Sequence, residues 1–282
     1  MGYRATDPVC RHRAHAVSYK RMMTRPVRFF VLLLLCVFAA APLFAVEDFL
    51  VPGVDLSDMT FETGAWCRYV VTDEALGQTD STDVYIGVPG SEMTADGRAY
   101  WVEIETSLRG ADAEDREIMK LLVLETITGF ADGDSLGDYV LKLYMKNGNE
   151  PAEEEDPRRL RDVSLRSAHA DSSWAIGDTL PVATAAGRFR CVKKQRLLEN
   201  NREIPTGNIV LLRKTRDNYQ VWFSRQIPVL HLAKCIIERS RETDTVPRIK
   251  GIPTGGVKES KTTAEIVAFG HDARTLVSVG GR

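Results

Sequence analysis

Apolar and polar side chains alternate along much of the chain after residue 65. In residues 98–106 (RAYWVEIET), aromatic or aliphatic residues at every second position alternate with Trp101, Glu103 and Glu105. Successive side chains of a β-strand point to opposite faces of a sheet, so this pattern indicates strands with one buried face. Such strands are typical of antiparallel sheets, because strands of parallel sheets are apolar on both faces. Further runs of this kind cover residues 66–72, 83–88, 138–146, 188–197, 208–214, 219–224, 232–240 and 263–270.

One segment, residues 113–130, is compatible with either a helix or a strand. Residues 117–124 suit a helix, whereas residues 121–128 are rich in strand-forming side chains. Periodicity does not separate the two in short apolar runs. We expect a strand over residues 118–125.

Two stretches are expected to be loops. Residues 147–167 (NGNEPAEEEDPRRLRDVSLRS) are charged and contain proline, and they separate the strands into two groups. A subdivision of the folded part would fall here. Residues 247–261 (PRIKGIPTGGVKESK) carry two prolines and three glycines, which is typical of an exposed connection. The sequence TGGVKES lacks the spacing of a phosphate-binding loop.

The start of the chain has the pattern of an export signal. Residues 29–45 (FFVLLLLCVFAAAPLFA) carry no charge, follow four basic residues at 20–28 and precede two acids. A basic region, an apolar region and a small residue at a cleavage point are the three parts of a secretory signal peptide. The pattern predicts cleavage after Ala45, a signal segment over 1–45, a single β-rich domain over 46–282, and a periplasmic or secreted protein.

Three alternatives concern this leader. An uncleaved anchor is one of them, because 17 apolar residues reach the lower end of the roughly 17–25 that span a bilayer. Met22 or Met23 would give a basic region of more ordinary length than Met1 does. Lipidation of Cys36 is not expected, because leucines rather than small residues precede it.

The charge of the predicted mature part is acidic. Of 37 basic residues, seven lie in residues 1–45, where Asp7 is the one acid, so residues 46–282 carry a net charge of −8. This balance argues against a nucleic-acid partner. Contact with a membrane is expected only through the signal segment, and no motif for a cofactor is present.

Three cysteines remain after processing. Cys67, Cys191 and Cys235 each lie inside a strand-like run. In an oxidising compartment a pair of them could form a disulfide of unknown pairing, or all three could be small buried apolar residues. A metal site is not expected, since zinc ligands are usually clustered in sequence.

No set of residues has the spacing of a catalytic site. Ser224 with His231 and an acid would make a hydrolase triad, but Ser224 lacks the G-x-S-x-G turn that exposes a nucleophile. Glu103 and Glu105 could act as an acid and base pair on a sugar, yet we expect both on the solvent face of their strand. The sequence therefore favours a protein without catalytic residues.

Aromatic residues are concentrated in the predicted strands. A curved sheet that presents them on its concave face could hold an acyl chain or another apolar ligand, and they could equally form an ordinary core. The residues we expect to line such a site are Trp66, Tyr69, Tyr100, Trp101, Trp222 and Phe223.

Three segments near the end of the chain have a familiar order: DTLPVATAAGRFRC at 178–191, YQVWFSRQIPV at 219–229 and the LAKCIIE that follows. On these segments the last 110 or so residues resemble exported bacterial lipoprotein carriers of the LolA and LolB type. The resemblance implies an antiparallel sheet curled into an open half-barrel with few helices. The chain departs from these carriers in being longer and lacking an obvious helical lid.

Together these patterns predict an exported envelope protein that binds a lipid, a lipoprotein acyl chain or a partner protein. A periplasmic hydrolase is the first alternative. A structural module that pairs an edge strand with an envelope partner is the second.

Overall fold

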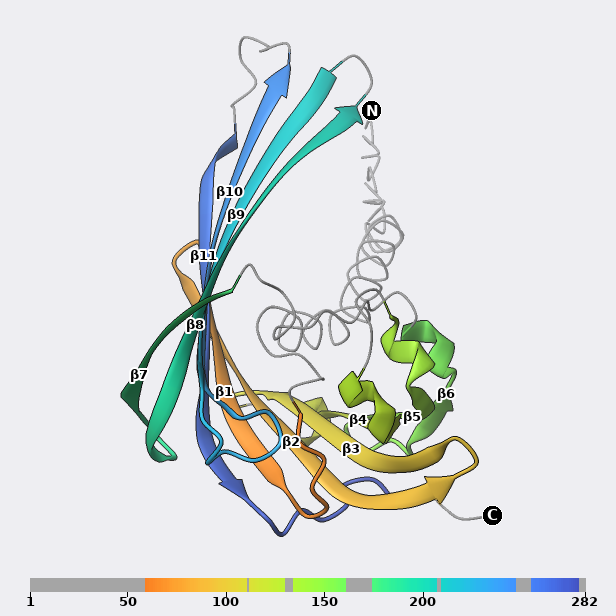
Figure 1. The fold of residues 1–282 in the computed structure, drawn as a ribbon. Helices are drawn as coiled ribbons and strands as arrows, with labels where there is room; N and C mark the ends of the chain where they lie inside the picture. Colours follow the sequence, from red (N-terminus) through yellow and green to blue (C-terminus); the bar gives the residue numbers. More distant parts are fainter. Residues whose placement is uncertain are drawn as a thin grey trace, which may run out of the picture. The chain divides into compact units, whose positions relative to one another are not determined.

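The computed structural model describes residues 59–110, 112–129, 134–160, 174–206, 209–246 and 255–278 (Figure 1). The chain divides into two compact units, Met1–Phe44 and Ala45–Arg282, and every described residue belongs to the second. The predicted signal segment and its cleavage point lie outside the described residues.

The second unit is built on one antiparallel sheet of 11 strands. Its order is β6-β5-β4-β3-β2-β1-β11-β10-β9-β8-β7. The described residues contain short 3-10 turns but no α-helix. The predicted fold class, an open antiparallel sheet with few helices, is confirmed. The strands are β1 (Trp66–Ala75), β2 (Gln78–Thr94), β3 (Gly97–Leu108), β4 (Glu117–Leu124), β5 (Val140–Asn147), β6 (Glu153–Glu155), β7 (Ala175–Thr184), β8 (Gly187–Thr206), β9 (Ile209–Phe223), β10 (Leu232–Val246) and β11 (Gly255–Gly270).

Two meanders of sequential strands meet at the centre of this sheet. β1 to β6 run outward in one direction, and β7 to β11 return from the opposite edge to pair β11 with β1. This central pair joins Trp66 to Gly270 at one end and Ala75 to Ser260 at the other. Within the described part of the chain, no helix is long and apolar enough to cross a bilayer.

Several strands differ from the sequence prediction. β4 confirms a strand where a helix was the alternative. β6 and β7 were not predicted, and both are edge strands whose residues are mostly exposed, so they lack the apolar alternation. Pro181 in β7 fits such an edge, where a missing backbone N–H costs little. Residues 255–261 belong to β11 rather than to the predicted loop.

The core lies on one face of the sheet, which we call the inner face. Tyr69, Val102, Val221 and Ile266 are among the residues buried there. The connection between β9 and β10 folds over this face, and its residues Ile227, Val229 and Leu230 are fully buried. Turns η4 (Glu125–Gly129), η5 (Leu136–Asp138) and η6 (Pro157–Leu160) add Ile127, Leu136 and Leu160 to the same cluster.

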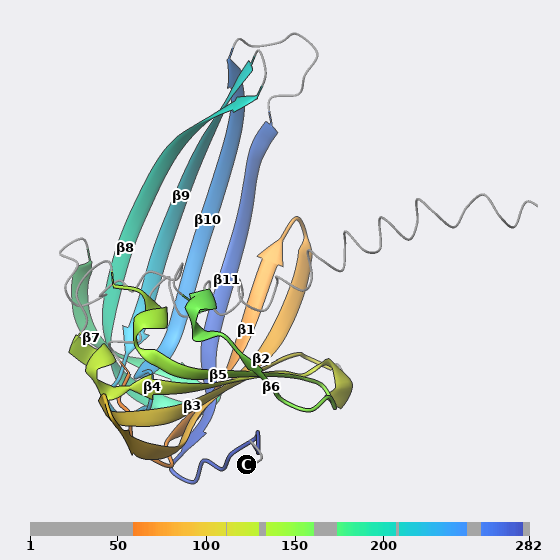
Figure 2. The ribbon, with the colours of Figure 1, turned by 90° about the vertical axis from the view of Figure 1, so that its right-hand side faces the viewer.

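Four strands continue well past the β1–β2 hairpin (Figure 2). β1 pairs with β11 only from Ser260 onward, and among the described strands β8 pairs with β9 alone beyond Gln195. We call residues 197–206, 209–217, 239–246 and 255–259 the extension. It is a four-stranded ribbon with side chains on two faces, and the inner one is continuous with the core face.

Candidate functional site

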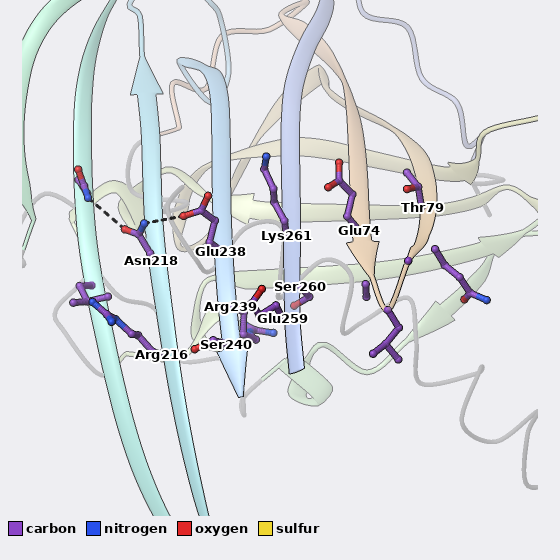
Figure 3. A pocket seen from close by; sticks show the side chains of 16 residues that line it. Glu74, Thr79, Arg216, Asn218, Glu238, Arg239, Ser240, Glu259, Ser260 and Lys261 are labelled. Carbon is purple, nitrogen blue, oxygen red and sulfur yellow. Dashed lines mark hydrogen bonds between the residues drawn. The ribbon is translucent and has the colours of Figure 1, made fainter. Parts of the chain in front are cut away.

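A groove of about 770 Å³ lies on the outer face of the sheet, between the β1–β2 hairpin and strands β8 to β11 (Figure 3). Its central side chains come from five strands in one cross-strand row. The register pairs Thr79 with Glu74, Glu74 with Lys261, Lys261 with Glu238, and Glu238 with Asn218. We call these five residues the polar row.

The polar row follows from the pairing of neighbouring strands. Register partners on adjacent strands lie on the same face, about 5 Å apart. Asn218 Nδ2 donates to Glu238 Oε2 at 3.1 Å, and Gln195 Nε2 donates to Asn218 Oδ1 at 3.4 Å. The groove therefore presents carboxylates, an ammonium group and amides side by side. These groups can accept hydrogen bonds from a bound group and donate hydrogen bonds to it.

Exposed leucines border the groove at both ends of the polar row. Leu197 of β8 pairs with Asn218 and is 47% exposed, and Leu76 in the β1–β2 turn is 79% exposed. Leu76 also has a φ of 54°, a left-handed conformation that disfavours a side chain such as leucine. An exposed apolar side chain held in an unfavourable conformation is a common feature of binding surfaces.

We expect Leu76→Asn to stabilise the fold while weakening binding at the groove. Asparagine followed by Gly77 is the preferred pair for a two-residue turn with positive φ at both positions. The free energy of unfolding in urea should rise by about 1 kcal/mol. Leu108→Asn, at another exposed leucine, should bring no gain; a loss of stability in Leu76→Asn would contradict the strain argument.

The six predicted ligand-binding aromatics divide between the two faces. Tyr69 and Tyr100 are buried on the inner face, where Tyr69 donates to Leu232 O at 3.1 Å and Tyr100 stacks on Phe61 at 5.2 Å. Phe223 lies on that face as well, beneath the buried Lys194. The alternation places the three tryptophans Trp66, Trp101 and Trp222 on the outer face. The structure does not bring the six into one pocket.

The outer-face tryptophans are held by neighbouring groups. Trp66 stacks on Tyr85 at 5.9 Å and donates through Nε1 to Asp272 at 2.8 Å. A Cβ on Gly270 would meet Trp66 Nε1 at 2.7 Å, so only glycine leaves room for the ring. Trp101 lies beneath Lys120 and Lys142. These contacts are those of a covered sheet surface.

The prediction that Glu103 faces solvent is wrong. Glu103 is fully buried and pairs with Lys120 at 2.9 Å. The C-terminal segment 271–278 crosses the outer face here, so that Thr275 Oγ1 and the Leu276 N–H donate to Glu103, while Lys120 donates to Val277 O. Alternation identifies an outer face, but it does not reveal that a distant segment covers it.

Glu105 lies apart from this ion pair. It pairs with Arg116 at 3.3 Å in a polar pocket of about 160 Å³ that Tyr85 also lines. Burial, followed by the charge of Glu103, raises the pKa of Tyr85 to about 12. The two glutamates are thus held by different cations.

Ser224 and His231 close the β9–β10 connection. The Ser224 N–H donates to His231 O at 2.7 Å, and Ser224 Oγ accepts from the Gln226 N–H at 3.4 Å. The His231 ring contacts Ile227 O through Nδ1 and Thr60 Oγ1 through Nε2, both at 2.6 Å. Both ring nitrogens are thereby engaged in holding the connection in place.

The three cysteines are free and buried. This fits the second of the two interpretations given above, that of small buried apolar residues. Burial raises the pKa of Cys67 and of Cys235 to about 12 each. Among the described residues, no group of three or more His, Cys, Asp or Glu side chains could hold a metal ion.

Sequence reasoning missed the groove because its residues come from six strands whose register no local pattern gives. The one available signal was the alternating charge in residues 238–242 (ERSRE) of β10, which assigns Glu238 and Arg239 to opposite faces.

In comparisons with known proteins, no family model and no curated protein matches the chain. Among solved structures, it is similar to a candidate lipoprotein of Parabacteroides distasonis ATCC 8503, with 10% identity and a TM-score of 0.33, over 77% of this chain and 99% of that one. MucB in complex with MucA(peri) matches with 10% identity and a TM-score of 0.11, over 77% of this chain and 95% of that one. The Pseudomonas aeruginosa MucA/MucB complex matches with 9% identity and a TM-score of 0.10, over the same shares.

Proposed function

We propose that this chain is an exported protein of the bacterial cell envelope that acts by binding rather than catalysis. Its partner is a polar segment of another envelope protein, held in the outer groove. The leader at residues 29–45 supports export. The polar row is the observation behind the binding proposal. It places negatively charged hydrogen-bond acceptors, a positively charged donor and neutral polar groups along one groove.

The chemistry of the groove suits a protein segment better than an acyl chain. Glu74, Lys261 and Glu238 alternate in charge along the polar row, and Asn218 adds an amide. A polypeptide offers backbone and side-chain groups that pair with each of these, and apolar side chains for Leu76 and Leu197. An acyl chain would leave them without partners, at a cost for each desolvated group.

We propose a protein without catalysis because the two residues considered for a hydrolase site, Ser224 and His231, already make structural hydrogen bonds. The backbone of Ser224 and both ring nitrogens of His231 fasten a buried connection. A general base needs a free ring nitrogen near the nucleophile and the substrate. These contacts favour a structural role for both residues.

Site-specific photo-crosslinking in bacterial cells tests the partner. A photoreactive residue at Leu76 or Leu197 should give one discrete adduct. The same group at Leu108 or Met93, which are 59% and 72% exposed outside the groove, should not. Adding Lys261→Glu, which makes three consecutive positions of the polar row acidic, should reduce the adduct about tenfold. An adduct of equal yield at all four positions would contradict the proposal.

A second candidate is the binding of an apolar ligand, such as a lipid or the acyl chain of a lipoprotein. Leu198 and Leu211 favour it, because the register puts them on the inner face of the extension and neither is fully buried. Native mass spectrometry of the protein from an envelope fraction, before and after denaturation, should then reveal a mass that is lost on unfolding. A bare polypeptide starting at Val46 would count against this candidate and leave the groove proposal standing.

A further inference from the structure

The inner face of the extension is strongly basic. Along β10 the residues alternate so that Arg239 and Arg241 share the face of the core residue Ile237, while Glu238 and Glu242 point the other way. In the other strands most acids alternate onto the outer face, which also carries Lys214 and Arg216, and the inner face is left with an excess of basic residues. The basic inner-face residues are Arg202, Arg213, Arg239, Arg241 and Lys258, and the acidic outer-face residues include Glu199, Glu203, Glu238, Glu242 and Glu259.

Like charges stand directly opposite each other on this inner face. Arg202 pairs in register with Arg213 across β8 and β9, and Arg241 pairs with Lys258 across β10 and β11. Such cross-strand pairs of equal charge destabilise a sheet. Two of them on one face indicate a surface selected for something other than the stability of the free protein.

Among the described residues of the extension, the one acid on the inner face is Asp217, and it pairs with Arg239 at 3.0 Å. Arg213 Nε is buried and has no hydrogen-bond partner in the part of the chain that the structure describes. A buried guanidinium donor without an acceptor is costly, and an anionic ligand would satisfy it.

Apolar side chains lie beside these cations. Leu211 is two residues from Arg213 on the same face of β9, and Leu198 on β8 pairs with Asp217. We propose that the inner face of the extension binds an anionic amphiphile, whose head group contacts Arg202, Arg213 and Arg241 and whose chain lies on the leucines. This inference rests on the second candidate function and adds the charge of the ligand's head group.

Three detergents with the same 12-carbon chain test it with the protein purified after export. Dodecyl phosphate, zwitterionic dodecylphosphocholine and neutral dodecyl maltoside are titrated below their micelle concentrations, with inorganic phosphate as a fourth ligand. Dodecyl phosphate should bind at least about tenfold more tightly than the other three, because each charge-assisted hydrogen bond contributes roughly that factor. Its affinity should fall as salt rises.

Arg202→Gln and Arg241→Gln should each weaken dodecyl phosphate binding about tenfold. Lys214→Gln is the matched control, because Lys214 adjoins Arg213 in β9 on the outer face and is exposed. Without ligand, Arg202→Gln should raise Tm by about 1–2 °C, since it removes a like-charge pair. This combination of weaker binding with higher stability excludes simple misfolding.

Other outcomes overturn the inference separately from the function proposals. Equal binding of the three detergents would leave the apolar-ligand candidate intact and remove the role of the arginines. Equal binding of dodecyl phosphate and inorganic phosphate would remove the role of the leucines. Tighter binding of an acidic glutamate peptide than of dodecyl phosphate would make the face a protein surface, and no binding by any probe would reject the site.

Discussion

Lys120→Met should lower the free energy of unfolding by about 3–5 kcal/mol, the range found when one partner of a buried ion pair is removed. Glu103 has no exposed surface, and Lys120 supplies its charge partner at 2.9 Å. Methionine retains the apolar stem over Trp101 but leaves the carboxylate with only the donors from Thr275 and Leu276. Lys120 also donates to Thr275 and Val277, so its loss frees the C-terminal segment.

Lys142→Met provides the control for this variant. Lys142 covers the same Trp101 ring and pairs with Glu92 at 3.8 Å, but its side chain is 45% exposed. Exposed pairs contribute little, so the loss should stay below about 1 kcal/mol. Urea unfolding with an unchanged m-value measures both variants. Equal losses would show that the cation over Trp101, rather than the buried charge pair, determines the effect.

Stability should fall in alkali earlier than tyrosine ionisation alone would cause. Burial raises the pKa of Cys67 and Cys235 from 9.0 to about 12, so the folded protein keeps both thiols neutral after the unfolded chain has ionised. The contribution of the two neutral thiols to the free energy of unfolding is fully present below pH 9 and is lost as the pH rises from 9 to 12. At pH 10 each thiol should lower the free energy of unfolding by on the order of 1 kcal/mol.

The double variant Cys67→Ala and Cys235→Ala isolates this effect. Its unfolding free energy should be lower at pH 7, because two buried side chains are truncated. Between pH 8 and pH 10 its stability should change much less than that of the parent. Burial also raises the pKa of Tyr69, but tyrosine contributes mainly above pH 10. An equal slope in parent and variant would show that the thiols are not what titrates.

The strands of the core could be predicted from sequence because their alternation records burial on one face. Where both faces of a strand are polar, the alternation is absent and the strand was not predicted. Residues 208–214 and 219–224 were expected as two strands, yet β9 continues through Asp217 and Asn218. These poor strand formers are held by cross-strand partners, Arg239 for Asp217 and Glu238 for Asn218. Such support depends on register, which local propensity does not contain.

The candidate site was less predictable than the fold. The aromatic residues were expected to share a concave face, whereas Trp66, Trp101 and Trp222 alternate onto the opposite one. The polar row requires knowing that β1 follows β11 in the sheet, a pairing between strands at the two ends of the folded unit. Glu103 was predicted to face solvent because no residue near it in the sequence indicates that the C-terminal segment 271–278 covers it.

The central β1–β11 pair also bears on the proposed export of the chain. Trp66 and Gly270, which pair in it, are 204 positions apart in the sequence. Contacts between such distant residues form slowly, since a long loop must close before they are made. A chain that enters a translocation channel from its N-terminus would lack the last strand of its sheet until almost all of it has been synthesised. Until then it would remain unfolded enough to be threaded, so the strand order itself would delay folding until transport is under way.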